Sequence, residues 1–331
     1  MPRLVGVLRR SPTATVGVAL VLLLTVVAAL APWLTTAAPE YQFDTVAGKL
    51  LAPGSERFVF DFAGDRLSIL AERAQRTGDR AEIIRRGRTE SFPLAEVANL
   101  LPDGSFERRT FPLGTDRLGR DLWSRIVFGA RVSLSIGLLS ALVALAIGLL
   151  VGSLAAIGGP LVDGLLMRLV DTFLALPRLF LLIALVAVLS PGRWAIVAIL
   201  GGTTWMPISR LVRAEILGLK ERNFIHAARG LGQHPLAILR RHLLPNALTP
   251  ALVQTGLMIG GMILAESSLS FLGLGVPEPF PSWGQMIADI TGGPVRRWWM
   301  AAFPGFAIVL TVIAFNLLTD GLRDALDPRH R

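Results

Sequence analysis

The chain has 331 residues, of which 52% are hydrophobic and only 17% are charged, and it contains no cysteine. Soluble globular domains carry about 25% charged residues, so this composition argues against a soluble protein, and the lack of cysteine excludes disulfides, Cys-based zinc sites and thiol catalysis. The formal net charge of +9 comes mostly from Arg residues that flank apolar blocks, which favours an anionic membrane surface over nucleic acid as the partner.

The first apolar block covers residues 13–34 and follows Arg3, Arg9 and Arg10. A signal peptide has an apolar core of about 7–15 residues, whereas a span needs about 20, so we predict a retained membrane helix. Cleavage after the small residues 36–38 stays open as the alternative. The positive-inside rule places the N-terminus in the cytoplasm.

Residues 35–130 have mixed charges with Pro and Gly, and we predict that they form an extracytoplasmic segment. Residues 58–62 are typical of a short strand. Residues 65–80 are predicted to form a helix, because Leu67, Leu70 and Ala74 follow spacings of three and four. A small folded lobe and a partly disordered loop are both compatible with this composition.

Five further apolar blocks predict spans at Val132–Ile157, Leu165–Leu189, Trp194–Leu217, Pro250–Leu272 and Trp298–Leu318. The block at 165–189 is the weakest, since it is interrupted by Arg168, Asp171, Pro177 and Arg178. We therefore expect an all-α protein of six spans: a first helix within 1–34, a five-helix core over 131–318 with a cytoplasmic loop at 218–249, and a cytoplasmic tail over 319–331.

The loop between the fourth and fifth predicted spans has a helix-turn-helix pattern. Residues 218–230 are good helix formers, Gly232 suits a left-handed position after a helix, and Pro235 suits the first turn of the next helix. One face of that second helix is predicted to carry Leu236, Leu239 and Leu243. Pro245 is predicted to end it. Small Ala227 and Ala228 permit close approach, so the loop suits a helical surface that fits a partner's groove.

This loop resembles the cytoplasmic loop of permeases from binding-protein-dependent ABC importers. That family has a Glu-Ala-Ala triplet, then Gly after three residues, and Leu-Pro further on. The residues in register here are Ala227, Ala228, Gly232, Leu244 and Pro245, with His226 where Glu is common. The resemblance implies that the loop forms coupling helices that dock in a cleft of an ATPase subunit. Docking through a salt bridge of that Glu is not expected, because His226 replaces it.

Other blocks resemble the second permease type of oligopeptide, dipeptide and nickel importers. They lie at residues 112–121, 129–134, 265–275, 281–284 and 320–329. The resemblance covers about Phe111–Arg329 and, by position, the first span, and it leaves 35–110 outside. Within the first block, no paired acid or nucleophile accompanies Asp116, so we predict that it orders the entry to the second span and is not catalytic.

This resemblance implies a type I importer fold in a bacterial inner membrane, with both termini cytoplasmic. It also implies a second permease subunit, two ATPase subunits and an extracytoplasmic solute-binding protein as partners. The chain would bind no cofactor, since ATP is bound by the ATPases, and would be no enzyme. Peptides are the expected solutes, while nickel chelates, glutathione-like peptides, opines and sugars remain open.

Two acidic residues, Asp171 and Glu266, lie within or near predicted spans. Ionisable groups at membrane depth usually face an interior or a cavity, so both are candidates for a substrate pathway or gate. The alternative is a structural role, either at the membrane edge or in an internal salt bridge, for which Arg168 and Arg178 are the sequence neighbours of Asp171.

Several chemistries have no support in the sequence. Neither of the two lysines, Lys49 and Lys220, lies in the Gly-rich pattern of a phosphate-binding loop. Any ATP hydrolysis therefore requires another subunit. No metal site is expected, because three loop histidines at 226, 234 and 242 suit solvent or a partner. The rival functions are an ion-coupled secondary transporter that uses Asp171 and Glu266, and an intramembrane enzyme, which would need a nucleophile and base at depth.

Overall fold

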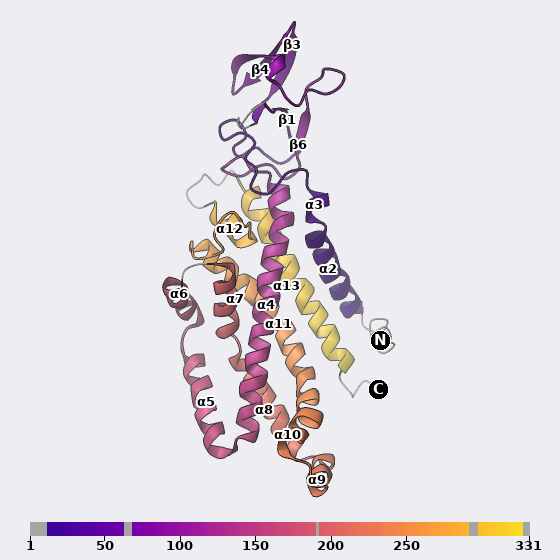
Figure 1. Ribbon diagram of the computed structural model, residues 1–331, viewed down its shortest axis with the longest axis vertical. Coiled ribbons are helices and arrows are strands. Elements are labelled where there is room, and N and C mark those ends of the chain that lie inside the picture. Colours follow the sequence, from indigo (N-terminus) through magenta and orange to yellow (C-terminus); the bar gives the residue numbers. More distant parts are fainter. Residues whose placement is uncertain (1–11, 63–67, 190–191, 291–296, 327–331) are drawn as a thin grey trace. The chain divides into compact units, whose positions relative to one another are not determined.

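The computed structural model describes residues 12–62, 68–189, 192–290 and 297–326 (Figure 1). Arg3, Arg9, Arg10 and the end of the predicted tail at 327–331 lie outside the described residues. The chain forms two units, one made from residues 1–25, 133–277 and 308–331, and the other from residues 26–132 and 278–307. We call the first the helical unit and the second the mixed unit.

Helices make up most of the described chain. In chain order they are α2 (Pro12–Ala29), α3 (Ala31–Leu34), α4 (Leu122–Ile157), α5 (Gly159–Ala175), α6 (Arg178–Val188), α7 (Arg193–Gly202), α8 (Met206–Lys220), α9 (Asn223–Gly230), α10 (Pro235–Ile238), α11 (Leu244–Phe271), α12 (Trp283–Ala288) and α13 (Trp299–Leu326). A short 3-10 turn covers Leu94–Glu96, and a π-helical turn at Leu239–Leu243 joins α10 to α11.

Among the described residues, four helical stretches are long and apolar enough to cross a membrane, or up to six if each of two bent pairs is one span. The four are α2, α4, α13 and the run Pro235–Phe271. The bent pairs are α5 with α6, at 93°, and α7 with α8, at 43°. Helix α4 also begins at Leu122, inside the predicted external segment.

The predicted single span at 165–189 is corrected to two helices with a sharp bend. Helix α5 ends at Ala175, Leu176 has extended ψ of 132°, and α6 starts at Arg178. Pro177 explains the break, because proline lacks an N–H donor and disfavours helical geometry in the residue before it. The six-span expectation is therefore reduced to four to six candidate spans.

Glycines allow close helix packing in the helical unit. A Cβ at Gly148 would lie 2.6 Å from Ile208 Cγ2, and one at Gly152 would lie 2.5 Å from the Ser209 carbonyl oxygen. Likewise, a Cβ at Gly256 would lie 2.6 Å from Thr319 Oγ1. Small residues are the usual means by which membrane helices approach each other. Helix α4 thus packs closely on α8, and α11 on α13.

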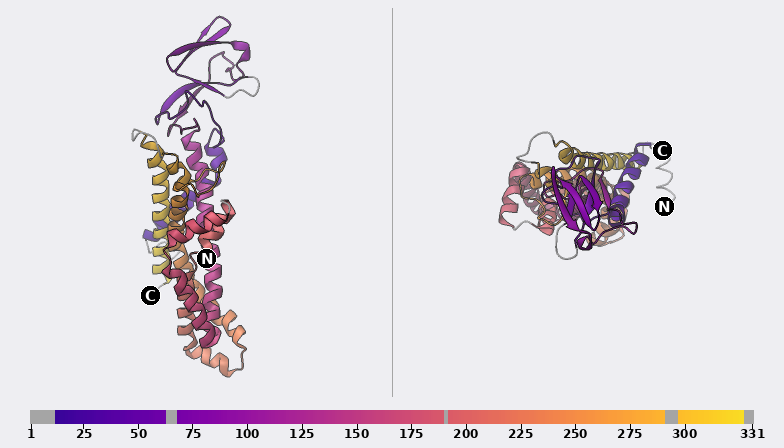
Figure 2. Two further views of the ribbon diagram at one scale, coloured as in Figure 1. Left: turned by 90° about the vertical axis from the view of Figure 1, so that its left-hand side faces the viewer. Right: turned by 90° about the horizontal axis from the view of Figure 1, so that it is seen from above.

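The expectation of an all-helical chain is wrong for residues 55–111, a lobe whose described residues form six strands. One antiparallel sheet has the order β2-β1-β6, and the other β3-β4-β5. Their bounds are β1 (Ser55–Phe60), β2 (Ile69–Ala71), β3 (Arg73–Thr77), β4 (Arg80–Arg85), β5 (Arg88–Pro93) and β6 (Arg108–Phe111). Figure 2 shows these strands from two directions.

The predicted strand at 58–62 is largely confirmed by β1, but the predicted helix at 65–80 is wrong. From Ile69 onward this segment forms β2 and β3, which turn at Gly78 into β4. Leu70 is fully buried opposite Val59, and Ala74 pairs with Ile83. Apolar pairs across an antiparallel sheet stabilise the strands, and such pairs outweigh a local helical spacing here. The predicted position Leu67 lies outside the described residues.

A buried carboxylate fastens the lobe. Asp44 accepts two hydrogen bonds from Arg85, at 2.8 and 3.0 Å, and others from the backbone N–H groups of Val46, Ala47 and Leu70. Burial by itself would raise the pKa of Asp44, but Arg85 and the three N–H donors together lower it below the usual value. The clasp therefore holds an ionised carboxylate.

The segment before α4 is ordered by Asp116, as the sequence predicted. Asp116 accepts hydrogen bonds from the backbone of Leu118 and Arg120 and forms ion pairs with the Arg120 and Arg125 side chains. Burial opposes the charge of Arg120, yet Asp116 and Glu278 raise its pKa above the ordinary value. These contacts account for Asp116 as a structural residue.

Candidate functional site

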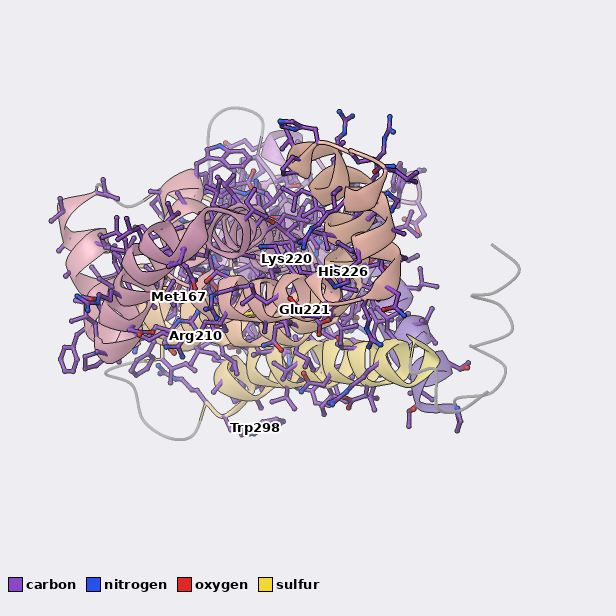
Figure 3. All side chains as sticks on the ribbon, turned by 90° about the horizontal axis from the view of Figure 1, so that it is seen from below. Met167, Arg210, Lys220, Glu221, His226 and Trp298 are labelled. Carbon is purple, nitrogen blue, oxygen red and sulfur yellow. The ribbon has the colours of Figure 1, made fainter. Side chains whose placement is uncertain are left out.

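The loop after α8, residues 221–245, forms an elbow of two short helices at one end of the helical unit. Helix α8 ends at Lys220, and only Glu221 and Arg222 separate it from the eight-residue helix α9. Backbone hydrogen bonds run through the break, from Arg222 N–H to the Leu219 carbonyl and from Ile225 N–H to the Arg222 carbonyl. Figure 3 looks onto this end, where Lys220, Glu221 and His226 lie close together.

Gly232 ends α9 in the way the sequence predicted. Its φ is +72°, and the Gly232 N–H donates to the Arg229 carbonyl while the Gln233 N–H donates to the Ala228 carbonyl. This pair of bonds defines a Schellman motif, in which the left-handed residue is usually glycine. The direction in which the chain leaves α9 is thus fixed by a residue with no Cβ.

The second arm of the elbow departs from the prediction at its far end. Pro235 starts α10 as expected, and His234 caps that helix by accepting a hydrogen bond from the Leu236 N–H at its Nδ1. Pro245, however, does not end the helix, because it lies in the first turn of α11. The π-helical turn just before it lets the chain continue through a residue that has no N–H to donate.

The predicted apolar face of this arm is partly corrected. Leu239 and Leu243 are buried, as is the neighbouring Ile238, but Leu236 is exposed. Ile225 and Ala228 of α9 are also buried. Each arm therefore buries one apolar side, with Ile225 and Ala228 on α9 and Ile238, Leu239 and Leu243 on the second arm.

The outer surface of the elbow carries the rest of the predicted site. His226, Ala227, Gly232 and Pro245 are exposed, Leu244 is partly buried, and Ala228 points inward. Apolar side chains accompany them, since Phe224 is 48% exposed and Leu231 81%. Helix α9 is too short to cross a membrane, so these side chains form an apolar surface suited to a protein partner.

Asp171 lies on α5 and pairs with Arg210 of α8. Neither sequence neighbour, Arg168 nor Arg178, forms this bond; Arg178 instead donates to Thr204 at 3.1 Å. Both partners remain about half exposed, at 58% for Asp171 and 51% for Arg210. Sequence reasoning missed Arg210, whose signal was a cation inside an apolar block.

Glu266 occupies a different environment. Its side chain is fully buried within α11 and accepts a hydrogen bond from Ser270 at 2.8 Å, one helical turn away. The structure therefore does not bring Glu266 and Asp171 together on one surface.

A second α5–α8 ion pair lies nearer the elbow and was not predicted. Arg213 binds both oxygens of Asp163, at 2.5 and 2.6 Å. Further along α8, Lys220 donates to the Ala156 carbonyl in the last turn of α4. Three cations of α8 thus bind α4 and α5. Among the described residues there is no group of acidic or histidine side chains that could hold a metal ion.

Comparison with known proteins places these features in context. Residues 148–331 match the family described as the binding-protein-dependent transport system inner membrane component, and residues 5–53 match the N-terminal transmembrane domain of oligopeptide transport permease C. In the sequence, the β lobe lies between the two matched regions.

Among curated proteins, the chain is 41% identical over 221 residues to the dipeptide transport system permease protein DppC of Bacillus subtilis (strain 168), which covers 66% of this chain and 68% of that protein. It is 44% identical over 219 residues to the di/tripeptide transport system permease protein DppC of Pseudomonas aeruginosa (strain UCBPP-PA14), covering 66% and 72%.

Among solved structures, the chain is similar to one in the inward-facing MetNI methionine ABC transporter. The TM-score is 0.52 and the identity 21%, over 62% of this chain and 98% of that one. This likeness supports the fold of the helical core.

Proposed function

Because the chain belongs to the family of binding-protein-dependent transport system inner membrane components, we propose that it lines the path by which peptides cross the membrane and that its elbow couples this path to ATP hydrolysis. The chain is a permease component of an ABC importer, and its family is not enzymatic; ATP is used by partner ATPases. The ion-coupled alternative has no support from these relatives.

The elbow is the proposed docking surface for the ATPase. Its exposed apolar residues Phe224 and Leu231 would be removed from water by a bound partner. Its buried residues pack α9 and α10 against the protein interior. A displacement of α9 would be transmitted to α8, because only two residues separate the two helices. ATP binding would close the ATPase pair and move the elbow as a rigid body, which tilts the spans and opens the pathway toward the binding protein.

The exposed pair of Asp171 and Arg210 is proposed to face the pathway. Asp171 lies on α5, which together with α6 forms a bent helix pair that is long and apolar enough to be a candidate span at membrane depth. A half-exposed charge pair at that depth is costly in lipid and is expected to face water or protein. The burial of Glu266 favours an internal, structural role for that residue.

Peptides are proposed as the solutes, on the basis of the two DppC relatives. The complete importer is proposed to hold a second permease, two ATPase subunits and a solute-binding protein. We also propose that both termini and the elbow lie in the cytoplasm, and that residues 35–121 lie outside.

The test of coupling uses Ala227, which is exposed on α9 and so tolerates a larger side chain without refolding. The importer is purified through a tag on this chain, and copurifying ATPases and ATP-driven uptake of a labelled dipeptide in proteoliposomes are measured. Ala227→Trp should lose most of the ATPase and the uptake, because a bulky group blocks the docking surface.

Thr77→Trp, at an exposed position of the lobe, is the matched control and should behave as wild type. Normal ATPase binding by Ala227→Trp would sink the proposed coupling surface. Wild-type uptake that proceeds without ATP would overturn the importer mechanism itself.

A further inference from the structure

The polar face of α8 holds cations at three levels, and each binds a neighbouring helix. Arg210 binds Asp171 and Arg213 binds Asp163, both on α5, while Lys220 binds the Ala156 carbonyl of α4. Positions 210, 213 and 220 recur at three and seven residues, so they share one side of the helix. The same helix leads directly into the elbow.

The two ion pairs differ in a way that separates their roles. Arg213 engages Asp163 with both Nε and Nη2, at 2.5 and 2.6 Å, and the two side chains are 30% and 24% exposed. The Arg210–Asp171 pair is about half exposed. A bidentate, mostly covered guanidinium–carboxylate pair fixes distance and orientation, whereas an exposed pair is weaker.

We propose that Arg213 and Asp163 are positioning residues that transmit the movement of the elbow to α5. This inference rests on the proposed coupling function. Helix α8 moves with α9, and the Arg213–Asp163 pair makes α5 follow. The sharp bend at Leu176–Pro177 lies at the far end of α5 and separates the direction of that helix from the direction of α6.

The opposite side of α8 explains why a second link is needed. Ile208 and Val212 pack into the seam formed by Gly148 and Gly152 of α4, which fastens α8 to α4. No comparable glycine seam joins α8 to α5 among the described residues. The two ion pairs are the polar links from α8 to α5, and the pair nearer the elbow is the better covered of the two.

The experiment compares transport with ATP consumption in the reconstituted importer. Asp163→Asn removes the charge of the pair with little change in volume. We expect the ATPases to copurify normally and to hydrolyse ATP, while dipeptide uptake per ATP falls about tenfold, a size typical of a coupled, partly buried pair. Glu215→Gln, which removes an acidic charge elsewhere on α8, is the matched control and should keep the wild-type ratio.

Rescue distinguishes transmission from a merely structural role. Asp163→Glu keeps the ion pair and should couple within about threefold of wild type. The exchange Asp163→Arg with Arg213→Asp should recover part of the ratio, though not all, because the exchanged guanidinium would lie near the positive N-terminal end of α5.

Two results would overturn the proposal: an unchanged uptake per ATP in Asp163→Asn, or an exchange variant no better than the worse single variant. Failure of the wild-type chain to bind ATPases would instead count against the coupling surface.

Discussion

At the scale of single residues, Gly232 is the most constrained position of the elbow. A Cβ there meets no neighbour within 4 Å, so the cost of substitution comes from its φ of +72° alone. For a residue other than glycine this conformation costs roughly 1–2 kcal/mol. Gly232→Leu should therefore bend the exit from α9, and we expect at least tenfold less ATPase to copurify while the protein still inserts in the membrane.

Gly230 offers a matched comparison, since it is the last residue of α9 and also has free space around a Cβ. Gly230→Ala should bind ATPase as wild type does. Equal binding by the Gly232 and Gly230 variants would show that the elbow does not need the left-handed residue.

His226 permits a second prediction, because it is exposed on α9 at the position of Glu in the loop pattern that the sequence resembles. His226→Glu adds a negative charge to an open surface and disturbs no packing, so uptake should stay within about threefold of wild type. The readout is ATP-driven dipeptide uptake at equal protein. Complete loss of uptake would show that the groove of the partner is adapted to histidine.

Asp44 governs the stability of the lobe, and its effect depends on pH. Since its folded pKa lies below the unfolded value of about 3.9, its contribution is fully present at neutral pH and is lost as the pH falls through the folded pKa. Asp44→Asn leaves Arg85 without its main carboxylate and should destabilise the lobe by about 3 kcal/mol at pH 7.

Hydrogen exchange of residues 44–51 and 69–85 measures this effect in the full chain. The acid-induced loss of protection below about pH 4 should flatten in the Asn variant. The control is Glu90→Gln, since Glu90 lies 3.8 Å from Arg85 and should contribute under about 1 kcal/mol. Protection equal to wild type in Asp44→Asn would show that Asp44 does not stabilise the lobe.

At the scale of elements, the α4–α8 seam leaves no room for a side chain. A Cβ at Gly152 would lie 2.5 Å from a backbone oxygen and 2.9 Å from Val212 Cβ, and backbone cannot yield cheaply. Gly152→Leu should therefore separate the helices at a cost of about 3 kcal/mol. Gly261→Leu, in open space on α11, is the control, and thermal unfolding in detergent compares the two. Equal unfolding temperatures would contradict close packing at the seam.

The elements that sequence predicted well are those fixed by local chemistry. Gly232 and Pro235 restrict their own backbone, and the apolar blocks are long enough to identify α2, α4, α11 and α13 by length alone. Local constraint of this kind needs no knowledge of the rest of the fold.

Features that depend on distant partners could not be predicted. The strand β2 depends on β1, and the Asp171–Arg210 pair joins residues 39 positions apart. The continuation of the chain past Pro245 required a π-helical turn, which has no simple sequence signal. Pro177 was noted as an interruption, yet only its flanking helices show that it produces a 93° bend.

At the scale of the whole molecule, coupling to an ATPase requires that the elbow lie on the cytoplasmic side of the membrane. The natural chain has no cysteine, so a single introduced thiol reports its own position without background. Exposed positions in the lobe and the elbow, Thr77 and Ala227, are suitable sites, because both accept a small side chain without disturbing packing.

We predict that Thr77→Cys reacts with a membrane-impermeant maleimide in cells whose inner membrane is intact, whereas Ala227→Cys reacts only after permeabilisation. Co-expression of the ATPases should then slow labelling at position 227, because docking covers that surface, and should leave position 77 unchanged. Labelling of Ala227→Cys from outside would place the elbow where no ATPase can reach it. The left-handed backbone of Gly232 and the α5–α8 ion pairs would then have a structural role in helix packing and no role in coupling.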